Sequence, residues 1–135
     1  MLDYLNKVNE VQLAMQKQGL CYKIADICRL AASMPAPRFY IDTQTAFKQY
    51  NLYKAGRSSI HGVYKRMMYA EIFARYEQSV ELLKSSGQHI GKQKIMEQIL
   101  SQSAPSFYYD DDTALKMYYY IMANKKRIKR CCISF

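Results

Sequence analysis

The sequence has no tryptophan, and its 135 residues include only five glycines and three prolines. An all-β sandwich needs many tight turns, so this shortage argues against one, and it leaves no glycine-rich phosphate-binding loop. No apolar run reaches the length of about 18 residues that a transmembrane helix needs, and the N-terminus lacks the basic-then-apolar order of a signal peptide. A membrane partner is therefore not expected.

Few residues could hold a metal or carry out catalysis. A zinc site needs about four ligands, usually with a Cys-x-x-Cys pair. The chain has two histidines and four cysteines, and no two of the cysteines have this spacing. Cys21 and Cys28 are seven residues apart and are predicted to be small core residues. The histidines have no nucleophile or carboxylate at a meaningful spacing. We therefore predict a protein that is not an enzyme, with no cofactor, no metal and no small-molecule substrate.

The spacing of the apolar residues predicts helices throughout the chain. Hydrophobic residues make up 50% of the sequence and recur every three to four positions. The predicted helices cover 3–18, 20–33, 43–55, 62–85, 92–102 and 113–129. The expected fold is all-α, a compact bundle of five to six helices in a single domain over residues 1–130.

An internal repeat is the most informative feature of the sequence. Residues 36–50, APRFYIDTQTAFKQY, match residues 104–118, APSFYYDDDTALKMY, at nine of fifteen positions and an offset of 68. Unrelated stretches would share about one identity. The chain is therefore predicted to contain two helix–loop–helix units, 20–55 and 92–130, joined by the long helix 62–85.

Most of the repeated residues have an expected structural role. Pro37 and Pro105 end the preceding helices. Phe39 and Phe107 are predicted to plug the loop and fix the angle between the two helices of each unit. Asp42 and Asp110 are expected to cap the helices that follow, and Ala46 and Ala114 to permit close helix packing. Lys48, Lys116, Tyr50 and Tyr118 are candidates for a duplicated contact surface, with a simple solvated face as the alternative.

The formal net charge of +9 is unevenly distributed. It amounts to +1 over residues 1–37, +5 over 38–76, −3 over 77–112 and +6 over 113–135. Lysine and arginine neutralise phosphates, and tyrosine can stack on a base. The candidate nucleic-acid-binding residues are Lys48, Tyr50, Lys54, Arg57, Lys65, Arg66, Lys116, Tyr118, Lys125, Lys126, Arg127, Lys129 and Arg130. Residues 125–135 form a basic tail that contains Cys131 and Cys132.

The order of a short helix, a connection and a longer basic helix is similar to that of a helix-turn-helix. The connection of about eight residues is longer than the usual three or four, and Asp110 to Asp112 would repel phosphate at the groove-facing end. The paired Ala-Pro-x-Phe-Tyr and Thr-Ala motifs, with RMMYAEIFARYE over residues 66–77, resemble small basic proteins of unassigned function from gut Bacteroidales, their phages and mobile elements. The resemblance covers residues 23–130 and implies a bacterial or phage source.

We therefore expect a small, basic, helix-turn-helix-like protein that binds DNA or RNA. The alternative is a structural, assembly or adaptor protein, either a phage particle component or an oligomeric interaction module, because 13 tyrosines and 8 methionines exceed what a small core hides. A third hypothesis is a lipid anchor, since the last four residues formally fit a prenylation box, although Ser134 matches it poorly. The expected location is the cytoplasm of a bacterial cell, or a phage-infected cell or virion.

Overall fold

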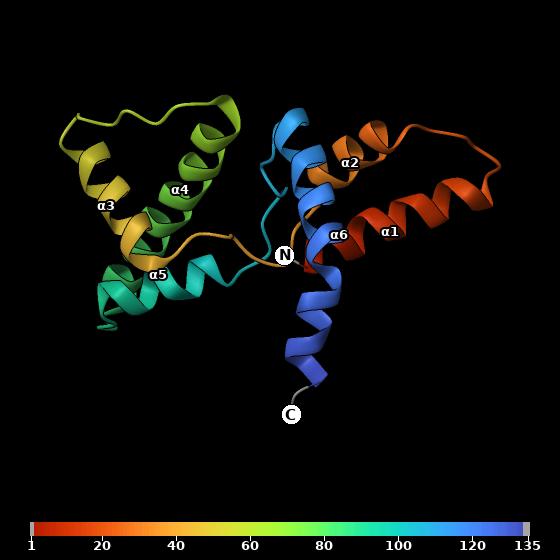
Figure 1. The fold of residues 1–135 in the computed structure, drawn as a ribbon. Coiled ribbons are helices and arrows are strands. Elements are labelled where there is room, and N and C mark those ends of the chain that lie inside the picture. The colour runs from red at the N-terminus through yellow and green to blue at the C-terminus, as the bar shows by residue number, and fades with distance from the viewer. Residues whose placement is uncertain (1, 134–135) are drawn as a thin grey trace. The chain divides into compact units, whose positions relative to one another are not determined.

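A computed structural model of the chain describes the backbone of residues 2–133 and the side chains of residues 2–124. Over this range the chain contains six α-helices and no strand, which confirms the predicted all-α fold. The helices are α1 (Leu2–Lys17), α2 (Ile24–Ser33), α3 (Thr43–Lys54), α4 (Val63–Ser86), α5 (Lys92–Leu100) and α6 (Asp111–Ile133) (Figure 1).

Most helix boundaries lie within two residues of the predicted ones, but α2 begins at Ile24 rather than at residue 20. Gly19 has a left-handed backbone with a φ of 70°. The Gly19 N–H donates to the carbonyl of Gln16 at 3.1 Å, and the Leu20 N–H donates to that of Met15 at 3.0 Å. These two bonds are the Schellman closure of a helix C-terminus. Because the chain turns sharply there, residues 20–23 remain outside any helix.

The late start of α2 changes the environment of one cysteine. Cys28 lies on α2 and is buried, as predicted. The prediction of a core position for Cys21 is wrong, because Cys21 lies in the non-helical segment and is exposed. The two residues therefore do not share a helix face.

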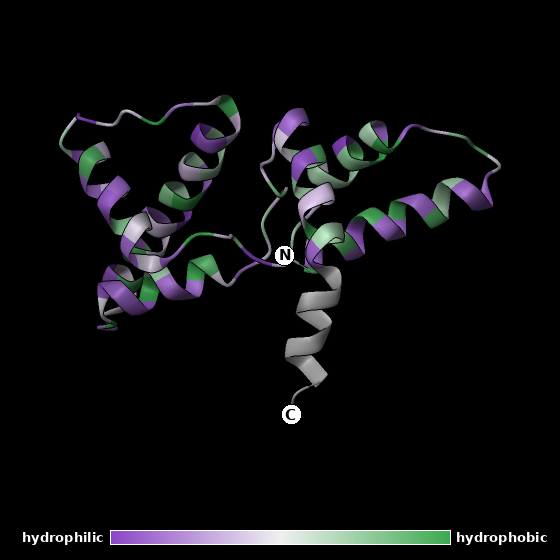
Figure 2. Ribbon diagram, viewed as in Figure 1, coloured by the Kyte–Doolittle hydropathy of each residue, from purple (hydrophilic) through white to green (hydrophobic). Residues whose placement is uncertain are grey.

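The helices group into two compact units by their backbone contacts. Unit 1 consists of Met1–Ala36 and Pro105–Phe135, and unit 2 consists of Pro37–Ala104. Unit 1 contains α1, α2 and α6, whereas unit 2 contains α3, α4 and α5. The span 1–130 that the sequence predicts as a single domain thus contains two three-helix units. The helices of both units contain hydrophobic and hydrophilic residues in turn along their length, as expected for helices that bury one face (Figure 2).

The two helices of each predicted helix–loop–helix repeat lie in different compact units. Helix α2 lies in unit 1 and α3 in unit 2, whereas α5 lies in unit 2 and α6 in unit 1. In unit 1, α2 packs against α6, and in unit 2, α5 packs against α3. Matching backbone hydrogen bonds hold these pairs. The Phe39 N–H donates to the carbonyl of Leu100 at 3.0 Å, and the Phe107 N–H donates to that of Ala32 at 2.9 Å. Both phenylalanines are buried, as predicted, but each is bonded to the first helix of the other repeat.

The helices that a helix-turn-helix interpretation would pair belong to different compact units. A helix-turn-helix places two consecutive helices of the chain in one packed unit. Here α2 and α3 belong to different units, and so do α5 and α6. The connection between α2 and α3 leaves Met34 and reaches Asp42 in extended conformations, with ψ of 158° at both. Pro35 and Pro37 disfavour a helical backbone at the residues that precede them, so this connection does not continue α2.

In the structure, each copy of the repeat covers about half of the chain. Helices α1 and α4 each end at a left-handed glycine, Gly19 and Gly87, and these two positions again differ by 68. The buried positions also correspond at this offset, as in the pairs Leu5 and Phe73, Val8 and Tyr76, Ile27 and Ile95, and Cys28 and Met96. The repeat therefore comprises three helices, α1 to α3 and α4 to α6. Helix α4 begins seven positions earlier than α1 at this offset, about two additional turns.

Candidate nucleic-acid interface

The predicted nucleic-acid-binding residues are divided between the two units. Six of them belong to unit 2, namely Lys48, Tyr50, Lys54, Arg57, Lys65 and Arg66. Lys116 and Tyr118 belong to unit 1, on α6. The side chains of Lys125, Lys126, Arg127, Lys129, Arg130, Cys131 and Cys132 lie outside the described residues.

Five of these six residues in unit 2 are cations with exposed side chains, and four of the five, all except Lys54, have no ion pair within the described part of the chain. Lys48 lies on α3, Arg57 lies in the connection from α3 to α4, and Lys65 and Arg66 lie in the first turns of α4. Among the residues whose side chains the structure describes, no carboxylate forms an ion pair with any of these four. Their charges are therefore available to a negatively charged ligand.

Arg57, Lys65 and Arg66 form what we call the basic end of unit 2, and the N-terminus of α4 adds to its positive charge. Its N-cap residue is Gly62, which provides no side-chain cap, and its first turn contains no acidic residue. The unpaired N–H groups of a helix N-terminus carry a partial positive charge, which cations such as Lys65 and Arg66 increase. By contrast, α3 is capped by Asp42, whose carboxylate accepts from the Thr45 N–H at 2.7 Å. The first turn of α4 is thus electrostatically unfavourable for the helix and favourable for an anion.

Lys54 and Tyr50 are engaged within unit 2. The Lys54 Nζ lies 2.8 Å from the Glu77 Oε1, and the Tyr50 hydroxyl donates to the same oxygen at 3.3 Å. The hydrogen bond from Lys54 lowers the pKa of Glu77 below its ordinary value, and burial followed by the nearby Glu77 charge raises the pKa of Tyr50. The structure therefore gives these two residues a role in joining α3 to α4.

Tyr50 belongs to a ladder of aromatic rings between α3 and α4. The ladder consists of Phe47, Tyr50 and Tyr53 on α3 and Tyr69, Phe73 and Tyr76 on α4, with ring centroids 4.8 to 5.9 Å apart between the two helices. These residues are three or four positions apart on each helix and therefore share one face of it. Tyr69, Phe73 and Tyr76 are buried. This ladder fixes how α3 lies against α4.

Tyr53 and Tyr64 are exposed aromatic residues at the basic end of unit 2, and neither is among the residues predicted from the sequence to bind nucleic acid. Tyr53 is 48% exposed and Tyr64 is 41% exposed. Tyr53 immediately precedes the end of α3, and Tyr64 lies in the first turn of α4. The signal in the sequence was their position next to Lys54 and Lys65, but spacing does not show which tyrosines are covered.

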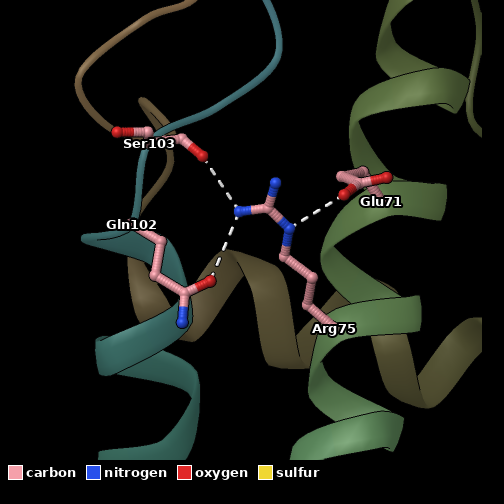
Figure 3. Close-up of polar contacts among 4 residues, drawn as sticks. All are labelled: Glu71, Arg75, Gln102 and Ser103. Atoms are coloured by element: carbon pink, nitrogen blue, oxygen red, sulfur yellow. Dashed lines mark hydrogen bonds and ion pairs between the residues drawn. The ribbon is translucent and has the colours of Figure 1, made fainter.

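Arg75 has a structural role in unit 2 (Figure 3). Its Nε donates to the Glu71 Oε1 at 2.8 Å, and its Nη1 donates to the Ser103 carbonyl at 2.9 Å and to the Gln102 Oε1 at 3.3 Å. The guanidinium also lies 5.1 Å from the centre of the Phe39 ring. Arg75 therefore holds the segment that follows α5 and the loop residue Phe39 against α4.

The corresponding positions on α6 in unit 1 have a different environment. The first turn of α6 contains Asp111 and Asp112, and Asp110 accepts from the Thr113 N–H at 2.7 Å. Lys116 is exposed and contributes to lowering the pKa of Asp110, after the backbone bond from Thr113. Tyr118 is half-buried and packs edge-on against Tyr119. This end of α6 carries negative charge, unlike the basic end of unit 2.

Unit 1 carries an apolar groove between α1 and α2 instead. The groove has a volume of about 360 Å³ and is lined by Glu10, Val11, Ala14, Met15, Gln18, Leu20, Tyr22, Leu30 and Met34. In unit 2, four of the apolar lining residues correspond to polar residues 68 positions later, namely Ser79, Gln88, Gln98 and Gln102. The two copies of the repeat have therefore diverged on this face as well.

No family model, curated protein or solved structure matches this chain. Among the described residues, no helix combines the length and the apolar character that crossing a membrane requires.

Proposed function

We propose that the chain is a non-enzymatic nucleic-acid-binding protein whose binding surface is the basic end of unit 2. The observation that carries this proposal is the concentration of Arg57, Lys65 and Arg66, all exposed and without a described acidic partner, at the α3–α4 connection and the start of α4. The resemblance to proteins of Bacteroidales phages and mobile elements would place it in the cytoplasm of a bacterial or phage-infected cell.

The chemistry of this end fits a phosphate backbone. Three flexible cations and the uncapped N–H groups of α4 provide donors for phosphate oxygens, and each neutralised phosphate releases counterions. Opposite this end, α4 finishes after 24 residues, about 36 Å along its axis. Lys84, Lys92 and Lys94, which are also exposed, lie near the turn that joins α4 to α5. They provide a matched set of cations in the same unit.

The test compares two triple variants by fluorescence anisotropy with labelled oligonucleotides. We expect Arg57→Ala/Lys65→Ala/Arg66→Ala to weaken binding by at least about tenfold at low salt and to reduce the slope of log K against log salt by about 2 to 3. The control Lys84→Ala/Lys92→Ala/Lys94→Ala removes the same charge and should retain most of the affinity. Equal losses in both variants, or no salt-dependent binding by the unmodified chain, would contradict the proposal.

The apolar groove of unit 1 favours a second candidate function, an assembly or adaptor protein. Leu30, Leu20 and Tyr22 line the groove and are 44% to 51% exposed, which suits a protein partner. A Leu30→Lys substitution places a charge on this face and should abolish self-association detected by light scattering. A protein that is monomeric at all concentrations and brings down no other protein from its host would argue against this function.

A further inference from the structure

The aromatic ladder of unit 2 ends in a ring that unit 1 does not have. Tyr53 stacks on Phe73, with ring centroids 5.1 Å apart and planes at 30°, and it is 48% exposed. The residue 68 positions later is Ile121 on α6, which is completely buried. The three-helix arrangement therefore accommodates a covered aliphatic residue at this position. An exposed aromatic ring here is specific to unit 2, and packing alone does not require it.

The turn after Tyr53 holds a cation beside this ring. Gly56 has a left-handed φ of 71°, and its N–H donates to the Tyr53 carbonyl at 3.1 Å. The Arg57 N–H donates to the carbonyl of Leu52 at 2.8 Å. These two bonds close the end of α3, so the backbone of Arg57 lies against the last turn that carries Tyr53. The exposed ring of Tyr53 and the exposed side chain of Arg57 therefore belong to the same tight turn at the end of α3.

We propose that the basic end of unit 2 binds single-stranded nucleic acid, with an unpaired base stacked on Tyr53 and adjacent phosphates bound by Arg57 and the cations of α4. This inference rests on the proposed function. A ring supported on one side by Phe73 is a stacking platform, and every base offers a π-face to it. The bases of a duplex are already stacked on one another, so a duplex gains only the phosphate contacts.

The experiment measures the affinity of the full-length chain for three labelled probes: an oligo(dT) of about 20 nucleotides, an oligo(U) of the same length and a duplex of about 20 base pairs. Tyr53→Ile installs the residue that unit 1 has, and Tyr53→Phe keeps the ring. Tyr120→Ile in unit 1 is the control, because Tyr120 is 53% exposed and lies outside the basic end of unit 2. Circular dichroism verifies that each variant is folded.

We expect Tyr53→Ile to weaken binding of the single strands by on the order of tenfold, with Tyr53→Phe and Tyr120→Ile close to the unmodified chain and duplex binding unchanged. Equal effects of Tyr53→Ile on single strands and duplex, or no effect on either, would overturn the stacking inference and leave nucleic-acid binding in place. No binding of any probe would overturn the proposed function itself.

Discussion

The hydroxyl of Tyr4 donates to the carbonyl of Ala114 at 2.7 Å, although the two residues are 110 positions apart in the chain. The same hydroxyl lies 3.4 Å from the carbonyl of Cys28, and Tyr4 is buried. One side chain of α1 therefore satisfies backbone groups on both other helices of unit 1. Burial, followed by the contact with Cys28, raises the pKa of Tyr4, so the hydroxyl stays protonated and remains a donor.

Tyr4→Phe is expected to lower the free energy of unfolding by about 1 kcal/mol, because it removes the buried hydrogen bond from the Tyr4 hydroxyl to the Ala114 carbonyl. Chemical denaturation monitored by circular dichroism measures the loss. Tyr22→Phe, at an exposed position, is the control and should change the stability little. A Tyr4→Phe variant as stable as the unmodified chain would contradict a stabilising role for this hydrogen bond.

Because the repeats exchange helices, we expect a core substitution to destabilise the helices of its own unit rather than those that are neighbours in the sequence. Phe39 is 1% exposed and belongs to unit 2, and Phe107 belongs to unit 1. Phe39→Ala should destabilise by about 3 to 5 kcal/mol and reduce hydrogen-exchange protection mainly in α3, α4 and α5. Phe107→Ala should reduce protection mainly in α1, α2 and α6. Reduced protection confined to α2 and α3 in the first variant would contradict the exchanged arrangement.

Arg75→Lys is expected to destabilise unit 2 by about 1 kcal/mol, since a single ammonium group cannot contact Glu71 and the Ser103 carbonyl with the geometry of a guanidinium. Thermal denaturation measures this change. Arg29→Lys is the control, because Arg29 has an exposed ion pair with Asp26 on its own helix and should tolerate lysine. If both substitutions have the same small effect, Arg75 contributes no more than a surface ion pair.

The two aspartate caps predict a loss of stability in acid. The backbone hydrogen bonds from Thr45 and Thr113 lower the pKa values of Asp42 and Asp110 below their ordinary value of 3.8. A carboxyl group whose pKa is lowered by folding stabilises the protein above its unfolded pKa. This contribution is lost as the pH falls through the lower, folded pKa.

Asp42→Ala should therefore lower the melting temperature by a few degrees at neutral pH, whereas Asp42→Asn should retain most of the cap. Melting temperatures measured from about pH 7 to about pH 3 should fall less steeply for Asp42→Asn than for the unmodified chain. Asp112, which lies in the first turn of α6, provides a control through Asp112→Asn. An unchanged acid dependence in Asp42→Asn would contradict the cap as its source.

Much of the local structure follows from the sequence through short-range rules. The apolar spacing predicts all six helices, and the two aspartates before α3 and α6 cap them as expected. The late start of α2 was not predicted, because the apolar spacing of residues 20–24 continues past the point where Gly19 turns the chain. The candidate site was predicted in part. Charge and position indicated Arg57, Lys65 and Arg66, but the pairing of Lys54 with Glu77 and the exposure of Tyr53 depend on the packing of α3 against α4.

The sequence by itself determined that the chain is helical and that it contains a segment written twice at an offset of 68, because capping, helix periodicity and internal identity are properties of neighbouring or aligned residues. Only the tertiary structure decided that α3 completes a unit with α5, and α6 with α2. The repeated motif offers the same apolar face to either copy of its partner helix. The choice between the two copies depends on long-range packing, which no local pattern encodes.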